Sequence, residues 1–277
     1  MINLLYCGDQ NAETGITMSL LSALRVSKEP LQVAIFTLSY KGEGYDIQPF
    51  RRSLAEYMDA YSRKVHPFNS VRLYNLQSEF AAALPKANMG TRFTPCCMLR
   101  LFADLVPNLP NRLLYLDYDV VARQDFSAFF HQDMSGVELA GVPDYYGRWF
   151  YSRPLWQRNY MNSGVLLMNM DEIRRSDLME RCRYLCSRER MFLPDQHALN
   201  RLCRSRRLWP SDYNEQRHLR PTTVLQHFST TFRVLPYPHK VSVKPWQKEA
   251  VHRVFGVCDY DNLLAETELI MKEVFTL

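Results

Sequence analysis

The sequence alternates apolar runs of strand length with segments of helical pattern. Runs such as INLLYC at 2–7 and LQVAIFTL at 31–38 are apolar at nearly every position, which is typical of strands covered on both faces. Parallel strands need long connections, and helices usually supply them. We therefore predict an α/β fold with a mostly parallel sheet. Its strands are expected at 2–7, 31–38, 71–76, 112–117, 139–144 and 164–169.

Helices are predicted between these strands. In the first one, apolar side chains fall on one helical face, and Thr14 or Asn11 is expected to cap it. The residues of that face are Ile16, Leu20, Leu21 and Leu24. Further helices are predicted at 49–64, 95–105, 171–188, 194–204 and 260–275. A chain of 277 residues with this alternation is expected to form one domain.

Composition places the chain among globular proteins, because apolar residues make up 47% and charged residues 23%. A net charge of +5 permits an anionic partner without specifying one. Seven cysteines form an odd set with no CxxC pair, which favours free thiols in a reducing compartment. We find no leader pattern and no apolar stretch of membrane-spanning length. We predict a cytoplasmic protein with at most peripheral contact at the inner membrane face.

Several segments depart from the strand and helix alternation. The stretches 144–160 and 228–247 are predicted to be long loops, and loops beyond the strand ends of an α/β sheet often bind ligands. The basic run at 201–207 lacks an accompanying nucleic-acid motif, so we interpret it as a solvated face and expect no nucleic-acid partner. The C-terminal segment 262–277 is acidic, which favours a helix packed on the domain over a membrane-binding helix.

The predicted strand at 112–117 leads into two acidic residues, Asp117 and Asp119. Side chains two apart on an extended chain point to the same side, so the two carboxylates can converge. Two carboxylates at such a short distance repel each other unless a cation lies between them. A divalent cation such as Mn²⁺ takes oxygen ligands and also accepts an imidazole, and His227 is our choice of third ligand. The alternatives are a solvated acid pair and a structural histidine.

Five motifs, in their order along the chain, resemble those of the retaining glycosyltransferases of family 8, which include bacterial galactosyl- and glucosyltransferases of cell-surface glycans and glycogenin. The motifs are LLYLDYDVV, YMNSGVLLMNM, LPDQHALN, HF and KPW, and the resemblance extends from the first strand to about Trp246. It implies a single GT-A domain with a Rossmann-like mixed sheet flanked by helices. The nucleotide-binding part would span about 1–125, and the acceptor and donor-sugar part about 126–277.

The same resemblance implies an activity. A hexose would move from a UDP-sugar, UDP-glucose or UDP-galactose, to a glycan, lipid-linked or protein acceptor, with Mn²⁺ or alternatively Mg²⁺ as the cofactor. Because no convincing carboxylate nucleophile is evident, retention is expected to proceed by front-face attack rather than through a covalent intermediate. Donor sugar, acceptor, linkage and oligomeric state are left open by the sequence.

Donor-binding roles follow from the resemblance for four residues. Asp9 and Asn11 would contact the uracil and ribose, and from the residues alone a helix-capping role is equally open. Arg100 would approach the donor, because a guanidinium offers a fork of donors suited to phosphate or hydroxyl groups. The alternative for Arg100 is a position on a helix surface. Tyr118, between the two aspartates, is grouped with the donor-binding residues.

The donor sugar is assigned a further set of residues by the resemblance. Asn162 and Ser163 would line its pocket, and Asp144 at a strand end would reach one of the two sugars. Asp195 would hold sugar hydroxyls and Gln196 would face the anomeric carbon. Both of these also stand where a helix is predicted to begin, and an acidic residue there is often a plain cap.

Lys244, in the KPW motif, would stabilise the leaving diphosphate, but its spacing departs from the family pattern. Seventeen positions separate His227 from Lys244 with no glycine between them, whereas the family usually places these residues much closer together. Either the intervening segment loops out, or Arg233, His239 or Lys240 takes the role. The departure also keeps open a catalytically impaired homologue that binds sugar nucleotides or serves as a partner subunit.

Two further interpretations remain at this stage. A strand ending in D-x-D is also how haloacid-dehalogenase-type phosphatases present their nucleophile, with Val121 in the matching place, but this leaves the MNSG, DQHALN and KPW motifs unexplained. The loop at 147–160 is expected to stack on acceptor sugars or to touch a lipid-linked acceptor, and its alternative is a plain covering loop. Its residues of interest are Arg148, Trp149, Phe150, Tyr151, Arg153, Trp156 and Arg158.

Overall fold

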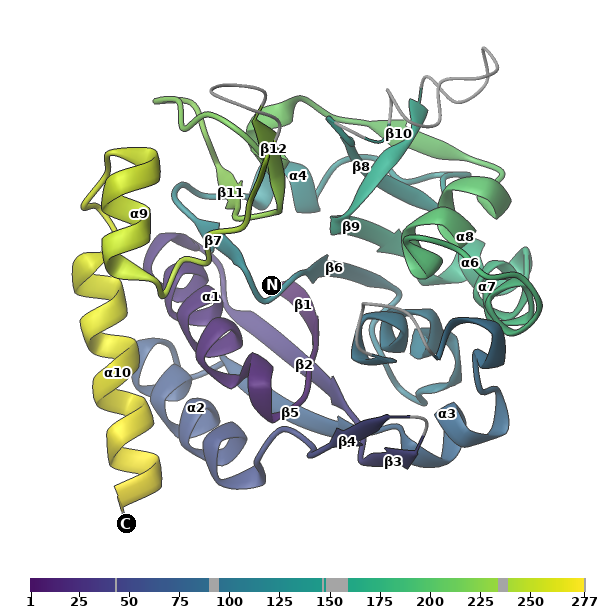
Figure 1. Cartoon of the computed structure of the whole chain (residues 1–277), viewed down its shortest axis with the longest axis horizontal. Helices are drawn as coiled ribbons and strands as arrows, with labels where there is room; N and C mark the ends of the chain where they lie inside the picture. Colours follow the sequence, from purple (N-terminus) through teal and green to yellow (C-terminus); the bar gives the residue numbers. More distant parts are fainter. Residues whose placement is uncertain (43, 90–94, 146, 148–158, 234–238, 277) are drawn as a thin grey trace.

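A mixed sheet forms the centre of the protein in a computed structural model (Figure 1). The structure describes residues 1–277 except 43, 90–94, 146, 148–158, 234–238 and 277. Within these residues the sheet has seven strands in the order β10-β8-β9-β6-β1-β2-β5. Their bounds are β1 Ile2–Cys7, β2 Leu31–Thr37, β5 Ser70–Asn75, β6 Arg112–Leu116, β8 Leu139–Pro143, β9 Met161–Asn169 and β10 Arg206–Leu208.

Most neighbouring strands of this sheet run parallel. β1 pairs in parallel with β2 and β6, β2 with β5, and β10 with β8. Only β9 runs against its two neighbours within the described part of the sheet. The predicted mixed, mostly parallel sheet is therefore confirmed, and each predicted strand is present within a few residues of its expected bounds.

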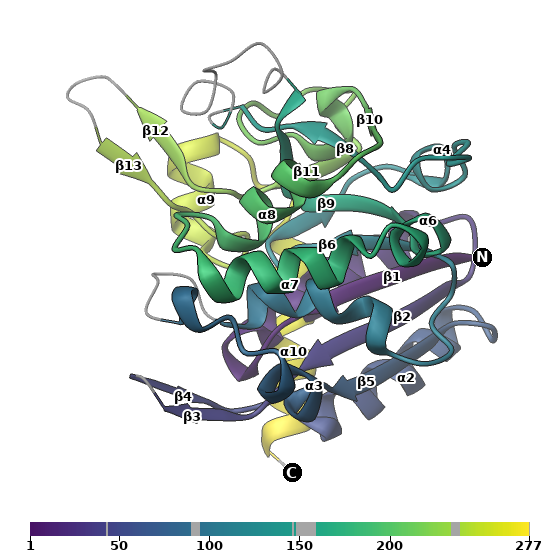
Figure 2. The same ribbon diagram turned by 90° about the vertical axis from the view of Figure 1, so that its right-hand side faces the viewer.

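Helices cover both faces of the sheet. On one face lie α1 Glu13–Val26, α2 Arg52–Val65 and α10 Asp261–Thr276, and on the other α7 Leu178–Arg188 and α8 Pro194–Leu202. Figure 2 shows α7 and α8 in front of the sheet and α10 behind it. Side chains of β1 alternate between the two layers, since Leu4 and Tyr6 join the core with α1 whereas Leu5 and Cys7 join the core with α7. This double burial explains the near-continuous apolar strands.

Among the residues that the structure describes, three short antiparallel pairs lie outside the main sheet. They are β3 Tyr40–Gly42 with β4 Tyr45–Ile47, β7 Val120–Ala122 with β11 Leu225–His227, and β12 Thr231–Arg233 with β13 His239–Val241. The β12–β13 pair corrects the prediction of a plain loop at 228–247. The other irregular segment, 144–160, lies mostly outside the described residues, and so do the residues of interest in its loop.

The remaining helices in the described part of the chain are short. They are α3 Gln77–Ala82, α4 Ser127–Phe130, α6 Met170–Arg175 and α9 Lys248–Phe255, with 3₁₀ turns at Gln10–Ala12, Lys86–Asn88 and Ser211–Asn214. The predicted helix at 171–188 is divided into α6 and α7 at Asp177, which has a φ of 55°. The segment Pro95–Leu105 is a 3₁₀ helix, labelled η3, and not an α-helix.

Two local predictions are corrected by the structure. The residue at the N-cap of α1 is Ala12, which makes no side-chain cap, so neither Thr14 nor Asn11 caps this helix. Asp9 instead caps the 3₁₀ turn before α1. The run at 201–207 is not simply solvated, because Arg206 lies in edge strand β10 and its guanidinium donates to the carbonyls of Asn200 and Cys203.

Other expectations hold. The C-terminal helix α10 packs against α1 and α2, as predicted for the segment 262–277. All seven cysteines are free thiols. Within the described residues, no helix combines the length and the apolar character that crossing a bilayer would need.

Candidate active site

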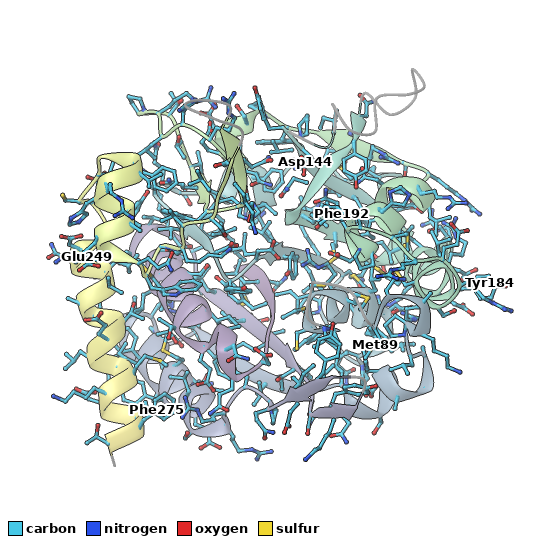
Figure 3. All side chains as sticks on the ribbon, viewed as in Figure 1. Met89, Asp144, Tyr184, Phe192, Glu249 and Phe275 are labelled. Atoms are coloured by element: carbon cyan, nitrogen blue, oxygen red, sulfur yellow. The ribbon has the colours of Figure 1, made fainter. Side chains whose placement is uncertain are left out.

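A cavity of about 870 Å³ opens beyond the carboxyl ends of β1 and β6. Every residue predicted as a metal ligand, a donor-binding residue or a catalytic residue lines it, although they come from segments far apart in the chain. They are Asp9, Asn11, Arg100, Asp117, Tyr118, Asp119, Asp144, Asn162, Ser163, Asp195, Gln196, His227 and Lys244. In Figure 3, Asp144 and Phe192 mark the part of the cavity next to β8 and α8, whereas Tyr184 lies at the outer edge of α7.

Asp117 and Asp119 follow β6 in a tight turn. The amide of Val120 donates to the carbonyl of Asp117 at 3.1 Å, so the two aspartates lie on a turn and not on an extended strand. The predicted convergence of the two carboxylates is observed, but the turn and its packing produce it. Opposite the turn, β11 pairs with β7 and brings His227 beside Val120.

Each carboxylate uses one oxygen for protein contacts and turns the other toward His227. Asp117 Oδ1 accepts from the Tyr115 hydroxyl at 2.6 Å and from Arg100 Nη2 at 2.9 Å, while its Oδ2 lies 3.7 Å from His227 Nε2. Asp119 Oδ2 forms an ion pair with Lys244 Nζ, while its Oδ1 lies 3.3 Å from His227 Nε2. Two carboxylate oxygens and one imidazole nitrogen therefore face one point.

The His227 ring is held in the tautomer that suits a ligand. Its Nδ1 lies 3.0 Å from Asn214 Oδ1, and the Asn214 amide nitrogen donates to Asn162 Oδ1 at 2.9 Å. Because the Asn214 amide is oriented in this way, His227 Nδ1 carries a hydrogen and its Nε2 points toward the carboxylates. Two carboxylate oxygens with one imidazole nitrogen fit a divalent cation such as Mn²⁺ or Mg²⁺.

The electrostatics of the site are consistent with this fit. Burial acts to raise the pKa of Asp119, but His227 and Lys244 together lower that pKa well below its ordinary value. Burial acts to lower the pKa of His227, and the two aspartates outweigh it and raise that pKa. Positive charge at this point thus stabilises the ionised carboxylates, as a bound cation would.

A second cluster of metal-ligating side chains is less suited to a cation. His252, Cys258 and Asp261 also bring donor atoms together near the α9–α10 junction. The Asp261 carboxylate already accepts from His252 Nε2 at 2.7 Å and lies 3.3 Å from Lys248 Nζ. The lysine supplies the positive charge there, so we interpret this cluster as an ion-pair link between two helices.

Gly164, in β9, leaves the space that the His227 ring occupies. A Cβ at this position would lie 2.2 Å from His227 Cε1 and 2.7 Å from Asp117 Oδ2. We expect Gly164→Ala to displace the imidazole and weaken Mn²⁺ binding by about 10-fold or more, as for the loss of a group that orients a ligand. Titration calorimetry measures this. Gly141→Ala in β8, where a Cβ would meet Leu166 at 3.1 Å, is the control and should leave the metal affinity unchanged.

Lys244 reaches the site despite its distance from His227 in the sequence. The segment between them folds back as the β12–β13 hairpin, and Thr230 and Ser242 at its base are joined by a hydrogen bond of 3.2 Å. The chain thus returns to nearly the point where it left. The lysine of the KPW motif lies against Asp119, so no substitute from the hairpin is needed.

Arg100 is engaged by protein groups more fully than predicted. The residue is 2% exposed, and its guanidinium donates to the carbonyls of Cys97 and Ser163. It also lies within ion-pair distance of Asp117 and Asp195 and stacks over the Tyr115 ring at 3.8 Å. Arg100 therefore lines the cavity but mainly joins two carboxylates, and the alternative of a helix-surface arginine is wrong.

A network of amides and carboxylates forms the wall next to β9 and α8. Gln196 Oε1 accepts from the Ser163 amide at 2.8 Å, and Gln196 Nε2 donates to Asp144 Oδ2 at 3.0 Å. Asn162 Nδ2 donates to the same Asp144 oxygen at 2.9 Å. Burial raises the pKa of Asp195, although Arg100 opposes the shift. The Gln196 side chain is thus fixed in orientation at both of its polar atoms.

At the other end of the cavity, Asp9 and Asn11 contact each other. Asp9 Oδ1 accepts from the Asn11 amide at 3.0 Å, and Asp9 Oδ2 accepts from Asn11 Nδ2 at 3.3 Å. Tyr118 is partly buried, and its ring lies 5.8 Å from that of Trp246. The predicted capping role and the cavity-lining position of Asp9 are therefore both present.

Sequence reasoning missed several residues that position this site. Tyr115, Asn214 and Gly164 each support a metal-site residue, and none was selected. Tyr115 was detectable in principle, because it lies in strand β6 two residues before Asp117, and an extended chain brings residues two apart to the same side. Asn214 lies in a short 3₁₀ turn without a local signal of its role.

Comparison with known proteins assigns the chain. The profile of the family described as "Glycosyl transferase family 8" matches residues 3–250. This chain belongs to glycosyl transferase family 8. The family 8 assignment confirms the predicted resemblance and excludes the phosphatase interpretation of the D-x-D strand.

Curated relatives of this family 8 chain include several transferases. The lipopolysaccharide 1,2-glucosyltransferase of Escherichia coli K12 is 28% identical over 217 residues, which are 71% of this chain and 63% of the relative. The glucoside xylosyltransferase 1 of Rattus norvegicus is 31% identical over 179 residues, which are 61% of this chain and 37% of the relative. The chain thus spans less than two thirds of the length of these relatives.

Solved structures support the fold. The galactosyltransferase LgtC, in complex with donor and acceptor sugar analogues, matches with a TM-score of 0.65 at 16% identity, covering 96% of each chain. The glycosyltransferase GlyE of Streptococcus pneumoniae TIGR4 matches with a TM-score of 0.63 at 17% identity, covering 96% of this chain and 63% of GlyE. These likenesses confirm the predicted GT-A fold.

Proposed function

We propose that this family 8 glycosyltransferase is a retaining hexosyltransferase. It takes a hexose from a UDP-sugar, UDP-glucose or UDP-galactose, and transfers it to a glycan, lipid-linked or protein acceptor. The observation that carries the proposal is the convergence of Asp117, Asp119, His227 and Lys244 at one point of the cavity. Loss of a diphosphate leaving group demands positive charge, which Lys244 and a cation held by the two carboxylates and the imidazole would supply at this point.

Asp117, Asp119 and His227 are proposed to hold Mn²⁺, with Mg²⁺ as the alternative. When bound, the cation supplies a Lewis acid that offsets the charge developing on the departing diphosphate. Lys244 Nζ, now paired with Asp119, stands next to the same point and would donate to a diphosphate oxygen. Charge on the leaving group is thus met by groups fixed before the donor arrives.

Retention is proposed to proceed by front-face attack. Asp144 already accepts hydrogen bonds from Asn162 and Gln196, and Asp195 is paired with Arg100. Carboxylates engaged in this way are weak nucleophiles, and the Gln196 oxygen is occupied by the Ser163 amide. A covalent adduct on Asp144 or Asp195, detected by intact mass with a slow donor, would overturn this proposal.

The bond changes are simple in this mechanism. The bond between the anomeric carbon and the diphosphate oxygen breaks, and the acceptor hydroxyl oxygen bonds to the same face of the sugar. The acceptor proton passes to the departing phosphate oxygen, so UDP leaves without help from a protein base. Gln196 and Asp195 would hold and orient the sugar during the exchange, because they line the cavity between β9 and α8.

We propose that the nucleoside and the sugar of the donor bind at different places along the cavity. Asp9 and Asn11 would exchange their mutual hydrogen bonds for bonds to uracil and ribose, near the ends of β1. Asn162, Ser163 and Asp144 would bind the hexose. The relatives include a glucosyltransferase and a xylosyltransferase, so the sugar itself is decided by pocket geometry and has to be measured.

The proposal is tested by UDP release from a panel of UDP-sugars, with Mn²⁺ and with a chelator. We expect release from one sugar that requires the metal and increases when a glycoside acceptor is added. Release that is insensitive to the chelator would contradict the metal assignment. Failure of UDP to bind, measured by calorimetry with Mn²⁺ present, would contradict the donor assignment.

The second interpretation is a homologue that binds sugar nucleotides without turnover, or a partner subunit. The long spacing between His227 and Lys244 is the reason for considering it. This reason is weakened by the structure, because Lys244 lies beside Asp119 despite the spacing. The interpretation still predicts a distinct outcome, which is tight UDP binding with no turnover on any acceptor. The single-domain division, the cytoplasmic location and the peripheral membrane contact stay predictions.

A further inference from the structure

Lys244 is separated from His227 by a hairpin, yet it lies in the site. We propose that a fixed dock of the KPW turn on helix α1, and not the hairpin, positions Lys244. In this dock, Trp246 and Tyr118 pack against Gly15. The inference rests on the proposed function for its kinetic test, but the dock itself can be tested without turnover.

The dock needs a glycine. Gly15 is buried in the first turn of α1, and a Cβ there would lie 2.7 Å from the Tyr118 ring and 2.7 Å from the Tyr118 carbonyl oxygen. It would also lie 2.8 Å from Trp246 Cζ3. Glycine within a helix costs about 1 kcal/mol relative to alanine, so its use here requires a compensating contact. The close approach of these two aromatic residues is that contact.

The dock is rigidly linked to Lys244. Lys244 to Gln247 form a turn in which the Gln247 amide donates to the Lys244 carbonyl at 3.0 Å. The Lys244 amide in turn donates to Gln247 Oε1 at 2.9 Å, and Pro245 stands at the second position that such turns favour. Because the turn is closed twice, fixing Trp246 also fixes Lys244.

The hairpin begins and ends at a fixed base. On one side, the amide of Phe228 donates to the Asp119 carbonyl at 3.0 Å, beside the strand pairing of His227. On the other side, Lys244 and Trp246 lie against Asp119 and Tyr118. The hydrogen bond between Thr230 and Ser242 joins the two sides. The number of residues between these two sides can therefore vary without moving Lys244.

The first test measures the reactivity of Lys244 toward an amine-acetylating reagent by mass spectrometry on the full chain. Lys248, with a side chain 50% exposed against 25% for Lys244, is the internal reference. Lys244 should react slowly in the wild type. In Trp246→Ala and Gly15→Ala its reactivity should rise toward that of Lys248, while Trp246→Phe should retain most of the protection. Unchanged reactivity in Trp246→Ala overturns the proposal.

The second test is a double-mutant cycle on donor hydrolysis. Lys244→Ala should lower turnover by about 100-fold, as for removal of one group that stabilises developing charge. Trp246→Ala should lower it by about 10-fold or more through misplacement of the lysine. The double variant should lose no more than Lys244→Ala alone, because the two residues act as one unit. Multiplied losses would show that Trp246 does not act through Lys244.

Excision of the hairpin completes the design. Residues 231–241 are replaced by a short Gly-Ser link, which the Thr230 and Ser242 contact makes sterically possible. We expect the low reactivity of Lys244 and the donor hydrolysis to be retained. If the excised protein folds but Lys244 becomes reactive, the hairpin positions the lysine and the inference is wrong. If it does not fold, the Trp246 and Gly15 variants still decide the question.

Discussion

Asp119→Asn is expected to abolish the response of this protein to Mn²⁺. The substitution keeps the shape of the side chain but removes the charge that pairs with His227 and Lys244. Turnover of the UDP-sugar should fall by about 1,000-fold, because a proposed metal ligand and the partner of the lysine are lost together. Saturating Mn²⁺ is expected to stabilise the wild type by about 2.7 kcal/mol at 100 times the Kd and so to raise its melting temperature, and this rise should be absent in Asp119→Asn.

Asp104→Asn is a matched control for this change. Asp104 forms a partly buried ion pair with Arg183 outside the cavity lining, with Asp104 Oδ2 accepting from Arg183 Nη2 at 2.9 Å. The control should lower the melting temperature without altering the stabilisation by Mn²⁺. Full retention of that stabilisation in Asp119→Asn would contradict the assignment of Asp119 as a ligand.

Arg100→Met is expected to give the largest loss of stability. The variant keeps an apolar stem but leaves the partly buried carboxylate of Asp117 and the buried carboxylate of Asp195 without their shared cation. Removing one partner of a buried ion pair costs about 3–5 kcal/mol of unfolding free energy. In a protein of this size the melting temperature should fall by roughly 10 °C, measured by calorimetry.

Arg183→Met separates stability from function in this experiment. Arg183 is also a buried arginine, 8% exposed, and it binds Asp104 and the Leu101 carbonyl. Both variants should lose stability, but only Arg100→Met should also weaken Mn²⁺ binding, because Arg100 positions Asp117. Equal metal affinity in the two variants would show that Arg100 has a purely structural role.

The local sequence pattern was sufficient to predict much of the fold. A strand buried on both faces is apolar along its whole length, and that property is written in consecutive residues such as 31–38. Edge strand β10 escaped detection because three residues with two arginines carry no such pattern. The 3₁₀ helix at Pro95–Leu105 differs from the predicted α-helix because a helical pattern of eleven residues favours an α-helix, whereas 3₁₀ runs longer than three or four residues are uncommon.

The candidate active site was likewise predictable from the sequence only in part. Carboxylates beyond a strand end, a histidine at another strand end and an ordered set of motifs were enough to select the residues that line the cavity. The hydrogen-bond and ion-pair partners of these residues could not be predicted from the sequence. The occupation of Arg100 by Asp117 and Asp195, and the support of His227 by Asn214, involve residues on separate elements that have no shared period.

By itself the sequence determined the α/β class, the positions of six of the seven described strands of the main sheet, the family and the chemical types gathered at the site, because each depends on neighbours along the chain or on motif order. Only the tertiary structure decided which groups meet. Lys244 lies 125 positions from Asp119, and the sequence spacing argued against its reaching the site. The contact forms because a glycine in α1 admits Tyr118 and Trp246, and packing between distant elements is a property of three-dimensional shape that no local pattern records.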